Sequence, residues 1–375
     1  MKVLFLAKHL DSGGVTTHMM TLAKGLKDKG CEVALASRGI VGDHLHGPEW
    51  FESNGVKHYF VPFPDYKPNI KNIRNLFYSV NALRKVIDDF QPDIIHVHWR
   101  ATSSFAQIMK FFRNIPFITT LHLDKIPSNA LFRVFSYWGE RTIAISSETR
   151  DFLVKNFKLN EETVKVIYNG VDDNYFRIPS QLERNMARRQ LDIDNNTKVV
   201  SLIGRLEKVK GHDVLIKALS ILKEKHKNKI VALFAGEGSQ YHSILQLAKQ
   251  YNVNDMIRMI GYQDSQKVYW ASDVLVLPSR KEGFPLAIVE AMLSGVVPIR
   301  TPAAGAYDQI EDGKTGFIIG FDDYKMLANR LDQLLSDDKF REKIAINIYN
   351  FAKENFTADI MVEKTFNVYR DVLRN

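Results

Sequence analysis

The stretch that decides the fold reads Val199-Val200-Ser201-Leu202-Ile203-Gly204-Arg205-Leu206-Glu207-Lys208-Val209-Lys210-Gly211. It opens with a short, mostly apolar run that is typical of a buried strand, and apolar residues then recur at helical spacing over residues 214–222. Glycines flank the turn between them, where the chain must change direction sharply. The stretch therefore predicts a strand, a tight turn and a helix, the unit from which parallel α/β sheets are built.

The same alternation of apolar runs and amphipathic segments extends along the whole chain. In the first half the runs predict strands at Val3–Ala7, Val33–Ala36, Ile94–Val97, Phe117–Thr120 and Thr142–Ile145, and helices at Thr17–Lys29 and Ile73–Phe90. In the second half they predict strands at Val199–Ile203, Ile230–Ala235, Met256–Ile260, Val274–Leu277 and Val297–Ile299, and a helix at Leu182–Arg189. The pattern predicts two doubly wound, Rossmann-like domains. Ligands of such sheets bind beyond the carboxyl ends of the strands, so we expect the domains to face a central cleft.

Length and composition agree with two globular domains. At 375 residues the chain exceeds the size at which one core keeps growing, and 45% hydrophobic with 25% charged residues is an ordinary globular balance. We place the first domain at residues 1–168, the second at 169–355 and a C-terminal segment at 356–375. The crossover is predicted at the turn Tyr168–Asp172.

Charge and cysteine content indicate the compartment and the kind of partner. No apolar stretch approaches the ~20 residues needed to span a bilayer, and the lone Cys31 fits core packing in a reducing, cytoplasmic setting. The net charge is +8, and residues 1–168 hold 22 Lys and Arg against 16 Asp and Glu. Without a nucleic-acid-binding motif, this basic half favours an acidic acceptor or an anionic membrane surface. We thus expect a cytoplasmic protein that can meet the inner face of the membrane.

Two glutamates in the run Lys281-Glu282-Gly283-Phe284-Pro285-Leu286-Ala287-Ile288-Val289-Glu290 carry the clearest chemical signal. Pro285 fits a first helical position, which places Glu282 in a loop and Glu290 in a helix. Amides of Gly283, Phe284 and the first turn can donate to an oxygen-rich ligand. Two carboxylates at different depths can hold two sets of hydroxyls, as in a sugar attached to a nucleotide. The alternative is a buried helix after a turn with a solvated Glu282.

Two glycine-rich turns point to phosphate. Arg205 and Lys210 lie where a strand end and a helix start would present them to phosphate oxygens. The alternative is a basic turn whose side chains are only solvated. The turn with Gly13 and Gly14 follows the first strand and permits close approach of the backbone to phosphate or sugar. Gly236-Glu237-Gly238 begins a dinucleotide fingerprint but lacks its third glycine, which argues against a nicotinamide or flavin site.

Histidines supply the best rival chemistry. His122 follows the strand Phe117–Thr120 and so lies at the carboxyl rim, where it can donate to a substrate oxygen. His96 and His98 alternate on one strand, so both side chains share a face and could form a metal site with His122. Since no partnered carboxylate motif supports that alternative, we predict no metal.

Taken together in this order, Gly13-Gly14, His122, Gly204-Arg205 with Lys210-Gly211, and Glu282-x7-Glu290 resemble the family 4 retaining glycosyltransferases of GT-B fold. The similarity covers nearly the whole chain. Looser supporting segments are Ile143–Ser146, Tyr168–Asp172, Ala271–Ser279, Glu290–Met292 and Gly295–Pro298. The resemblance implies retaining transfer of a sugar from a nucleotide diphosphate sugar, most naturally UDP-glucose or UDP-N-acetylglucosamine. It also implies that the C-terminal helix Ala358–Leu373 crosses back to the first domain.

The resemblance also implies a role for each site residue. Arg205 and Lys210 would neutralise the donor diphosphate, and Glu290 would accept hydrogen bonds from the ribose hydroxyls. Glu282 would hold sugar hydroxyls and support the transition state. The remaining contacts implied are amides of Gly283 and Phe284 to the sugar, His122 to the sugar from the first domain, Gly13 and Gly14 to phosphates and acceptor, and the backbone at Gly261-Tyr262 to the base. No cofactor is implied besides this donor substrate.

Because of departures from the family pattern, the resemblance does not identify the donor sugar. Gly283-Phe284-Pro285 stands where many members have Gly-Phe-Gly, and Arg300–Ala306 lacks a common glycine pair, with Asp308 in place of a later glutamate. The acceptor is expected to be a glycan or a lipid-linked molecule of a bacterial envelope, exopolysaccharide or teichoic-acid pathway. Aromatic and basic residues over 105–117 and over 130–141 are each expected on one helix, where they suit a membrane interface as well as they suit a core. The alternatives are a sugar-nucleotide epimerase of the same fold and a non-catalytic nucleotide-sugar-binding or docking protein.

Overall fold

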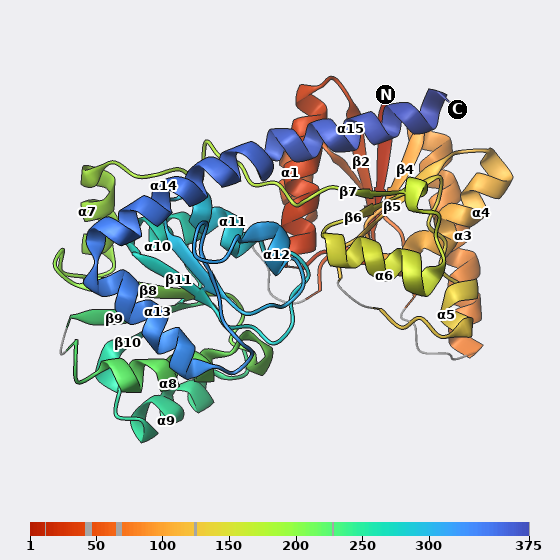
Figure 1. Ribbon diagram of the computed structural model, residues 1–375. Coiled ribbons are helices and arrows are strands. Elements are labelled where there is room, and N and C mark those ends of the chain that lie inside the picture. Colours follow the sequence, from red (N-terminus) through yellow and green to blue (C-terminus); the bar gives the residue numbers. More distant parts are fainter. Residues whose placement is uncertain (12, 42–46, 65–69, 124–125, 227–228, 375) are drawn as a thin grey trace. The chain divides into compact units, whose positions relative to one another are not determined.

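The computed structural model describes the chain except for residues 12, 42–46, 65–69, 124–125, 227–228 and 375. Contacts divide it into two compact units (Figure 1). Unit 1 comprises Met1–Gly170 and Ala358–Asn375, and unit 2 comprises Val171–Thr357. Each unit is a parallel sheet with flanking helices, so the predicted α/β class is confirmed.

Unit 1 carries a sheet with the strand order β3-β2-β1-β4-β5-β6-β7, and every pairing described in it is parallel. Its strands are β1 (Lys2–Leu6), β2 (Glu32–Ser37), β3 (Lys57–Phe60), β4 (Ile94–Val97), β5 (Phe117–Leu121), β6 (Arg141–Ala144) and β7 (Val164–Val166). Its helices are α1 (Gly14–Asp28), α2 (Pro48–Ser53), α3 (Ile70–Phe90), α4 (Ser103–Arg113), α5 (Ala130–Val134), α6 (Ser147–Phe157) and α15 (Ala358–Arg374). The strand order reverses between β1 and β4, which is where such sheets bind ligands.

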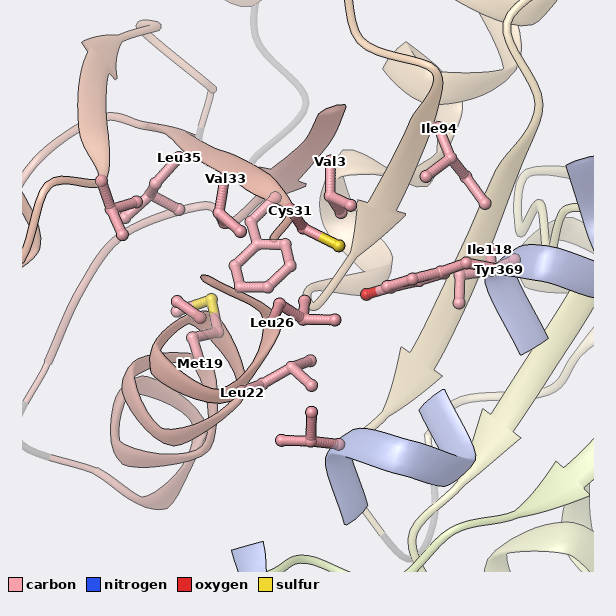
Figure 2. Packing of buried hydrophobic residues seen from close by; sticks show 14 of the residues in the cluster. Val3, Met19, Leu22, Leu26, Cys31, Val33, Leu35, Ile94, Ile118 and Tyr369 are labelled. Carbon is pink, nitrogen blue, oxygen red and sulfur yellow. The ribbon is translucent and has the colours of Figure 1, made fainter. Parts of the chain in front are cut away.

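The core of unit 1 depends on the last helix of the chain. Helix α15 packs against α1, and Tyr369 of α15 is fully buried in the same cluster as Val3, Leu22 and Ile118 (Figure 2). The two helices approach so closely that a Cβ added to Gly25 would lie 2.5 Å from a methyl of Val362. The chain end therefore completes the core that the chain start begins.

Unit 2 repeats the architecture with the strand order β10-β9-β8-β11-β12-β13. Its strands are β8 (Lys198–Ile203), β9 (Ile230–Ala235), β10 (Ile257–Gly261), β11 (Val274–Leu277), β12 (Val297–Arg300) and β13 (Phe317–Ile318). Its helices are α7 (Gln181–Gln190), α8 (His212–Leu222), α9 (Tyr241–Gln250), α10 (Ser265–Ala271), α11 (Leu286–Leu293), α12 (Ala306–Gln309), α13 (Tyr324–Ser336) and α14 (Asp338–Asn355). Here the order reverses between β8 and β11, so the loops that follow these two strands flank the expected binding position.

Three details correct the sequence-based expectations. Pro285 is the N-cap of α11 and not its first helical residue, since its ψ of 121° is extended. The aromatic segment over 105–117 is not one helix, because α4 ends at Arg113 and β5 begins at Phe117. Likewise only residues 130–134 of the segment over 130–141 are helical. No helix in the described part of the chain is both long and apolar enough to cross a bilayer.

Candidate functional site

The loops after β8 and β11 bring two predicted site residues into contact. Lys210 Nζ lies 2.7 Å from Glu282 Oε1, and their side chains are only 19% and 10% exposed. Lys210 lies in the predicted turn after β8, and Glu282 lies in the predicted loop before α11. Both loops flank the point where the strand order reverses. The pair places a cation and a carboxylate together at the carboxyl edge of the unit 2 sheet.

Gly211 fixes the turn that carries Lys210. Its φ is 74°, a left-handed value, and a Cβ there would lie 2.2 Å from the carbonyl oxygen of Pro278. The two loops are also joined by a hydrogen bond from the Arg280 amide to the Val209 carbonyl, at 2.7 Å. The position of Lys210 is therefore set by backbone contacts with the neighbouring loop.

Arg205 begins the same turn and has an exposed side chain. None of the ion pairs found among the described residues involves it. Its backbone is nevertheless held, because the next amide, that of Leu206, donates to the Glu237 carbonyl at 2.8 Å. A Cβ on Gly236 would lie 2.1 Å from the Gly204 carbonyl oxygen, so a glycine is needed here for the two loops to pack closely.

Glu290 lies on α11 and is held by a residue that the sequence reasoning missed. Its Oε2 is 2.9 Å from the hydroxyl of Tyr269, a fully buried side chain of α10. Burial raises the pKa of Glu290 to about 7, and the hydrogen bond from Tyr269 opposes that rise. Burial and the nearby carboxylate also hold the pKa of Tyr269 well above its usual value, so its hydroxyl stays a donor. No motif signals Tyr269, because a buried tyrosine on a helix usually serves packing.

The segment Gly283–Pro285 is supported by side chains from the end of β12 and from α12. Phe284 is buried and its ring packs edge-on against Phe356, so a role in binding would fall to its backbone. The Gln309 side chain donates to the Pro285 carbonyl at 3.0 Å, and Arg300 in turn donates to Gln309. Arg300 is fully buried and also donates to the carbonyls of residues 303 and 304. The departures noted in Arg300–Ala306 therefore build a support for this segment.

Gly261 is the last residue of β10, and Tyr262 follows it at the same edge of the sheet. Gly261 has a φ of 63°, and its carbonyl accepts a hydrogen bond from the Gly236 amide at 2.7 Å. The Tyr262 ring is 54% exposed. This arrangement leaves an aromatic face available for a flat ligand such as a base.

In unit 1 the Gly13–Gly14 turn begins α1. Gly13 is the N-cap, and its own amide donates to Asp11 Oδ1 at 3.0 Å. The donor capacity of this turn therefore lies in the first amides of α1 and not in Gly13 itself. The turn follows β1, next to the strand-order reversal of this sheet.

His122 lies at the same edge of unit 1, just after β5, within a group of histidines. Its Nε2 is 3.2 Å from Nδ1 of His98, and the ring of His18 on α1 lies 4.7 Å from its own, centroid to centroid. The His96 ring lies 4.0 Å from that of His98, centroid to centroid, but its nitrogens contact the Tyr369 hydroxyl at 2.6 Å and Thr120 Oγ1 at 2.7 Å instead of the other histidines. The predicted grouping of His96, His98 and His122 is thus wrong in one member: His18 takes the place of His96.

These histidines are neutral at physiological pH. Burial lowers the pKa of His18 to about 4. Burial, together with the neighbouring imidazoles, holds the pKa values of His98 and His122 well below the ordinary one. Each ring therefore offers one N–H donor and one lone pair.

Comparison with known proteins gives consistent matches along the chain. The family described as Glycosyltransferase Family 4 matches residues 12–175, and the family described as Glycosyl transferases group 1 matches residues 183–351. An uncharacterized glycosyltransferase of Methanocaldococcus jannaschii is 28% identical, over 96% of this chain and 94% of that protein. N-acetyl-alpha-D-glucosaminyl L-malate synthase of Bacillus anthracis is 27% identical, over 92% and 96% respectively.

Among solved structures, Anabaena HepE in complex with UDP-glucose superposes with a TM-score of 0.84. It is 21% identical and the match covers 99% of this chain and all of that one. At this identity the likeness concerns the fold, which is of the GT-B type.

Proposed function

This chain belongs to the family 4 glycosyltransferases of GT-B fold, and from that premise we propose that it transfers a sugar from a UDP-sugar to an acceptor hydroxyl with retention at the anomeric carbon. The observation that carries the proposal is the Lys210–Glu282 pair beside Arg205, at the carboxyl edge of the unit 2 sheet. Cations there suit a diphosphate and carboxylates suit sugar hydroxyls.

The donor phosphates are assigned to Arg205 and Lys210. As the bond from the sugar to the diphosphate breaks, negative charge grows on the leaving phosphate, and fixed cations stabilise it. Arg205 can supply a planar fork and Lys210 a point charge. When the diphosphate binds, Lys210 can turn from Glu282 toward it, which frees Glu282 Oε1 for the sugar. No further cofactor is needed in this scheme.

The sugar and nucleoside are assigned to the neighbouring residues. Glu282 and the amides of Gly283 and Phe284 would hold the donor sugar, and Glu290 would accept from the ribose hydroxyls. Gly261 and Tyr262 would flank the base. Tyr269 acts as a positioning residue, because its hydroxyl orients the Glu290 carboxylate.

Unit 1 would supply the remaining contacts. His122 would donate to the sugar through Nδ1, since its Nε2 faces His98. Gly13 and Gly14 would bring the start of α1 to phosphate or acceptor. A front-face reaction, in which the leaving phosphate oxygen takes the proton of the acceptor hydroxyl, fits a site whose described acids are engaged in binding.

The names of similar proteins support a UDP-sugar and a small or glycan acceptor. HepE is solved with UDP-glucose, and the Bacillus relative is named as a glucosaminyl malate synthase. We propose UDP-glucose or UDP-N-acetylglucosamine as donor and an envelope glycan, exopolysaccharide or teichoic-acid precursor as acceptor.

The test measures binding first and stereochemistry second. Thermal unfolding is recorded with a panel of UDP-, GDP- and ADP-sugars, because a ligand at about 100 times its Kd adds about 2.7 kcal/mol. The donor that shifts the midpoint is then incubated with acceptors, and the anomeric configuration of the product is read by NMR. A shift with UDP-sugars and an axial-to-axial outcome are expected for an α-linked donor. An inverted anomer would overturn retention, and no shift with any donor would overturn the assignment of unit 2.

We also propose that unit 1 associates with the anionic inner face of the membrane. Phe111 and Phe112 at the end of α4 are 80% and 70% exposed, and Val134 and Phe135 near α5 are 66% and 57% exposed. Exposed aromatic and aliphatic side chains can insert between lipid headgroups. The net charge of +8 favours binding to anionic lipid. A lipid-linked acceptor would then be presented near the protein.

Vesicle flotation tests this association. The wild-type chain is expected to float with anionic vesicles in a salt-sensitive manner and less with neutral ones. The double variant Phe111→Ser, Phe112→Ser should stay at the bottom, whereas Phe321→Ser, which removes an exposed aromatic of unit 2, should float normally. Equal flotation of the two variants would remove α4 from the interface.

A further inference from the structure

The histidines of unit 1 contain an unusual buried polar group. His18 is 3% exposed, and its side-chain hydrogen bond to Asn169 can satisfy one of its two ring nitrogens and leaves the other without a partner among the described residues. A buried donor or acceptor without a partner loses its hydrogen bonds to water and gains none, so native proteins rarely keep one. Such a group usually marks a missing ligand, water or ion.

The nitrogens of His18, His98 and His122 converge. One ring nitrogen from each of the three lies within 4.8 Å of the corresponding nitrogens of the other two. The closest pair, His98 Nδ1 and His122 Nε2, are 3.2 Å apart. Two imidazoles that bind one tetrahedral zinc at about 2.0–2.1 Å have their nitrogens about 3.4 Å apart. The pair already has this spacing, and a small movement of the His18 ring would complete the set.

We propose that His18, His98 and His122 bind one divalent transition metal, with zinc as the best fit. The three rings come from α1, from the end of β4 and from the end of β5. A metal there would tie these elements together at the carboxyl edge of the unit 1 sheet. His122 would bind the metal through Nε2, which faces His98, and keep Nδ1 for the sugar, so the metal site does not rest on sugar transfer.

The chemistry of the three side chains favours zinc over the lighter cations. Neutral imidazole is a ligand for zinc, copper, nickel and iron, whereas magnesium and calcium prefer oxygen. Three histidines leave one tetrahedral position for water or another ligand. His96, two residues from His98 on the same strand, cannot compete, because both of its nitrogens are already hydrogen-bonded.

The site is tested by metal binding and not by activity, so its outcome is independent of the donor and acceptor. Protein without a histidine tag is equilibrated with zinc, freed of loose metal, and analysed by mass spectrometry for about one zinc per chain. Cobalt is substituted in parallel, since tetrahedral cobalt gives strong visible absorption and octahedral aqueous cobalt does not. Zinc is also expected to raise the thermal midpoint of unfolding.

Variants separate a built site from surface binding. His18→Leu and His122→Gln should each abolish the cobalt spectrum and the rise in midpoint. His242→Gln removes an exposed histidine of unit 2 and should change neither.

Two results would overturn the proposal. One is wild-type protein that retains no zinc after equilibration and shows no tetrahedral cobalt spectrum. The other is His18→Leu that binds metal as the wild-type chain does.

Discussion

Binding of the donor should depend on pH through Glu290. Partial removal of its carboxyl from water raises the pKa of Glu290 to about 7, and only the ionised form can accept from both ribose hydroxyls. A raised carboxyl pKa means that the binding-competent form is present above about pH 7 and is lost as the pH falls below it. Donor affinity should therefore decrease on acidification within the neutral range.

The size of the effect follows from the ionised fraction. With a pKa of about 7, that fraction falls from about nine-tenths at about pH 8 to about one-tenth at about pH 6. The apparent Kd scales with its inverse, so it should rise roughly tenfold over that interval. His212 of the same unit does not contribute, since burial lowers its pKa to about 4.

Calorimetric titration with an intact UDP-sugar is the assay. The intact donor is essential, because free UDP has a terminal phosphate that titrates near pH 6 whereas the diphosphate of the sugar nucleotide is esterified at both ends. The titration is repeated at neutral pH in two buffers of different ionisation enthalpy. The difference between the two measured binding enthalpies gives the number of protons released when the donor binds. About half a proton per donor should be released at about pH 7.

Two variants provide the controls. Glu290→Gln should bind the donor more weakly and show a flat pH profile. Tyr269→Phe removes the hydrogen bond that lowers the pKa of Glu290, so its profile should move to higher pH. A wild-type Kd that is the same at both ends of the interval, or a Glu290→Gln profile as steep as the wild-type one, would refute the ribose role.

Three further outcomes are expected. Lys210→Ala should lower kcat by about 10²- to 10³-fold in a steady-state assay, because it removes charge stabilisation of the leaving diphosphate. Lys208→Ala, in the same turn, is the control and should have little effect on kcat. Equal effects of the two substitutions would show that Lys210 does not stabilise the leaving group. Gly211→Ala should lower the free energy of unfolding by more than Gly313→Ala. Both glycines have a left-handed φ, which costs alanine about 1–2 kcal/mol, but only the Cβ at position 211 would clash with a carbonyl oxygen. Equal losses in denaturant unfolding would contradict this prediction. Tyr369→Phe should cost about 1–3 kcal/mol, because it leaves His96 Nδ1 without its buried partner, and an unchanged denaturation midpoint would count against that hydrogen bond.

Most of the fold could be predicted because its strands are buried on both faces. Strands such as Ile94–Val97 and Val274–Leu277 read as continuous apolar runs, which is how parallel sheets appear in sequence. The strand Lys57–Phe60 was missed because it lies at the edge of its sheet and reads as polar and aromatic residues. The two-residue strand Phe317–Ile318 is too short to carry a pattern.

The candidate site likewise contains residues that the sequence predicted and contacts that it did not. Glu282 and Lys210 were predicted separately from their turns, but their contact joins positions 72 residues apart and follows only from the order of the strands. Tyr269 and His18 could not be predicted, because each lies on a helix whose pattern indicates packing alone. His96 and His98 share a strand face, yet a nearby tyrosine from the last helix engages one of them, which spacing along a strand does not reveal.

The contribution of α15 to the core of unit 1 has a consequence for synthesis on the ribosome. Domains generally fold as units while the chain emerges, the first one before the next. Here the first 170 residues leave the exit tunnel without Tyr369, Met361 and Val362, which belong to their core cluster. All of Val171–Thr357 must be translated before that cluster can close. The nascent first unit thus waits with an open apolar face, and the interval in which chaperones can act on it equals the translation time of the entire second unit.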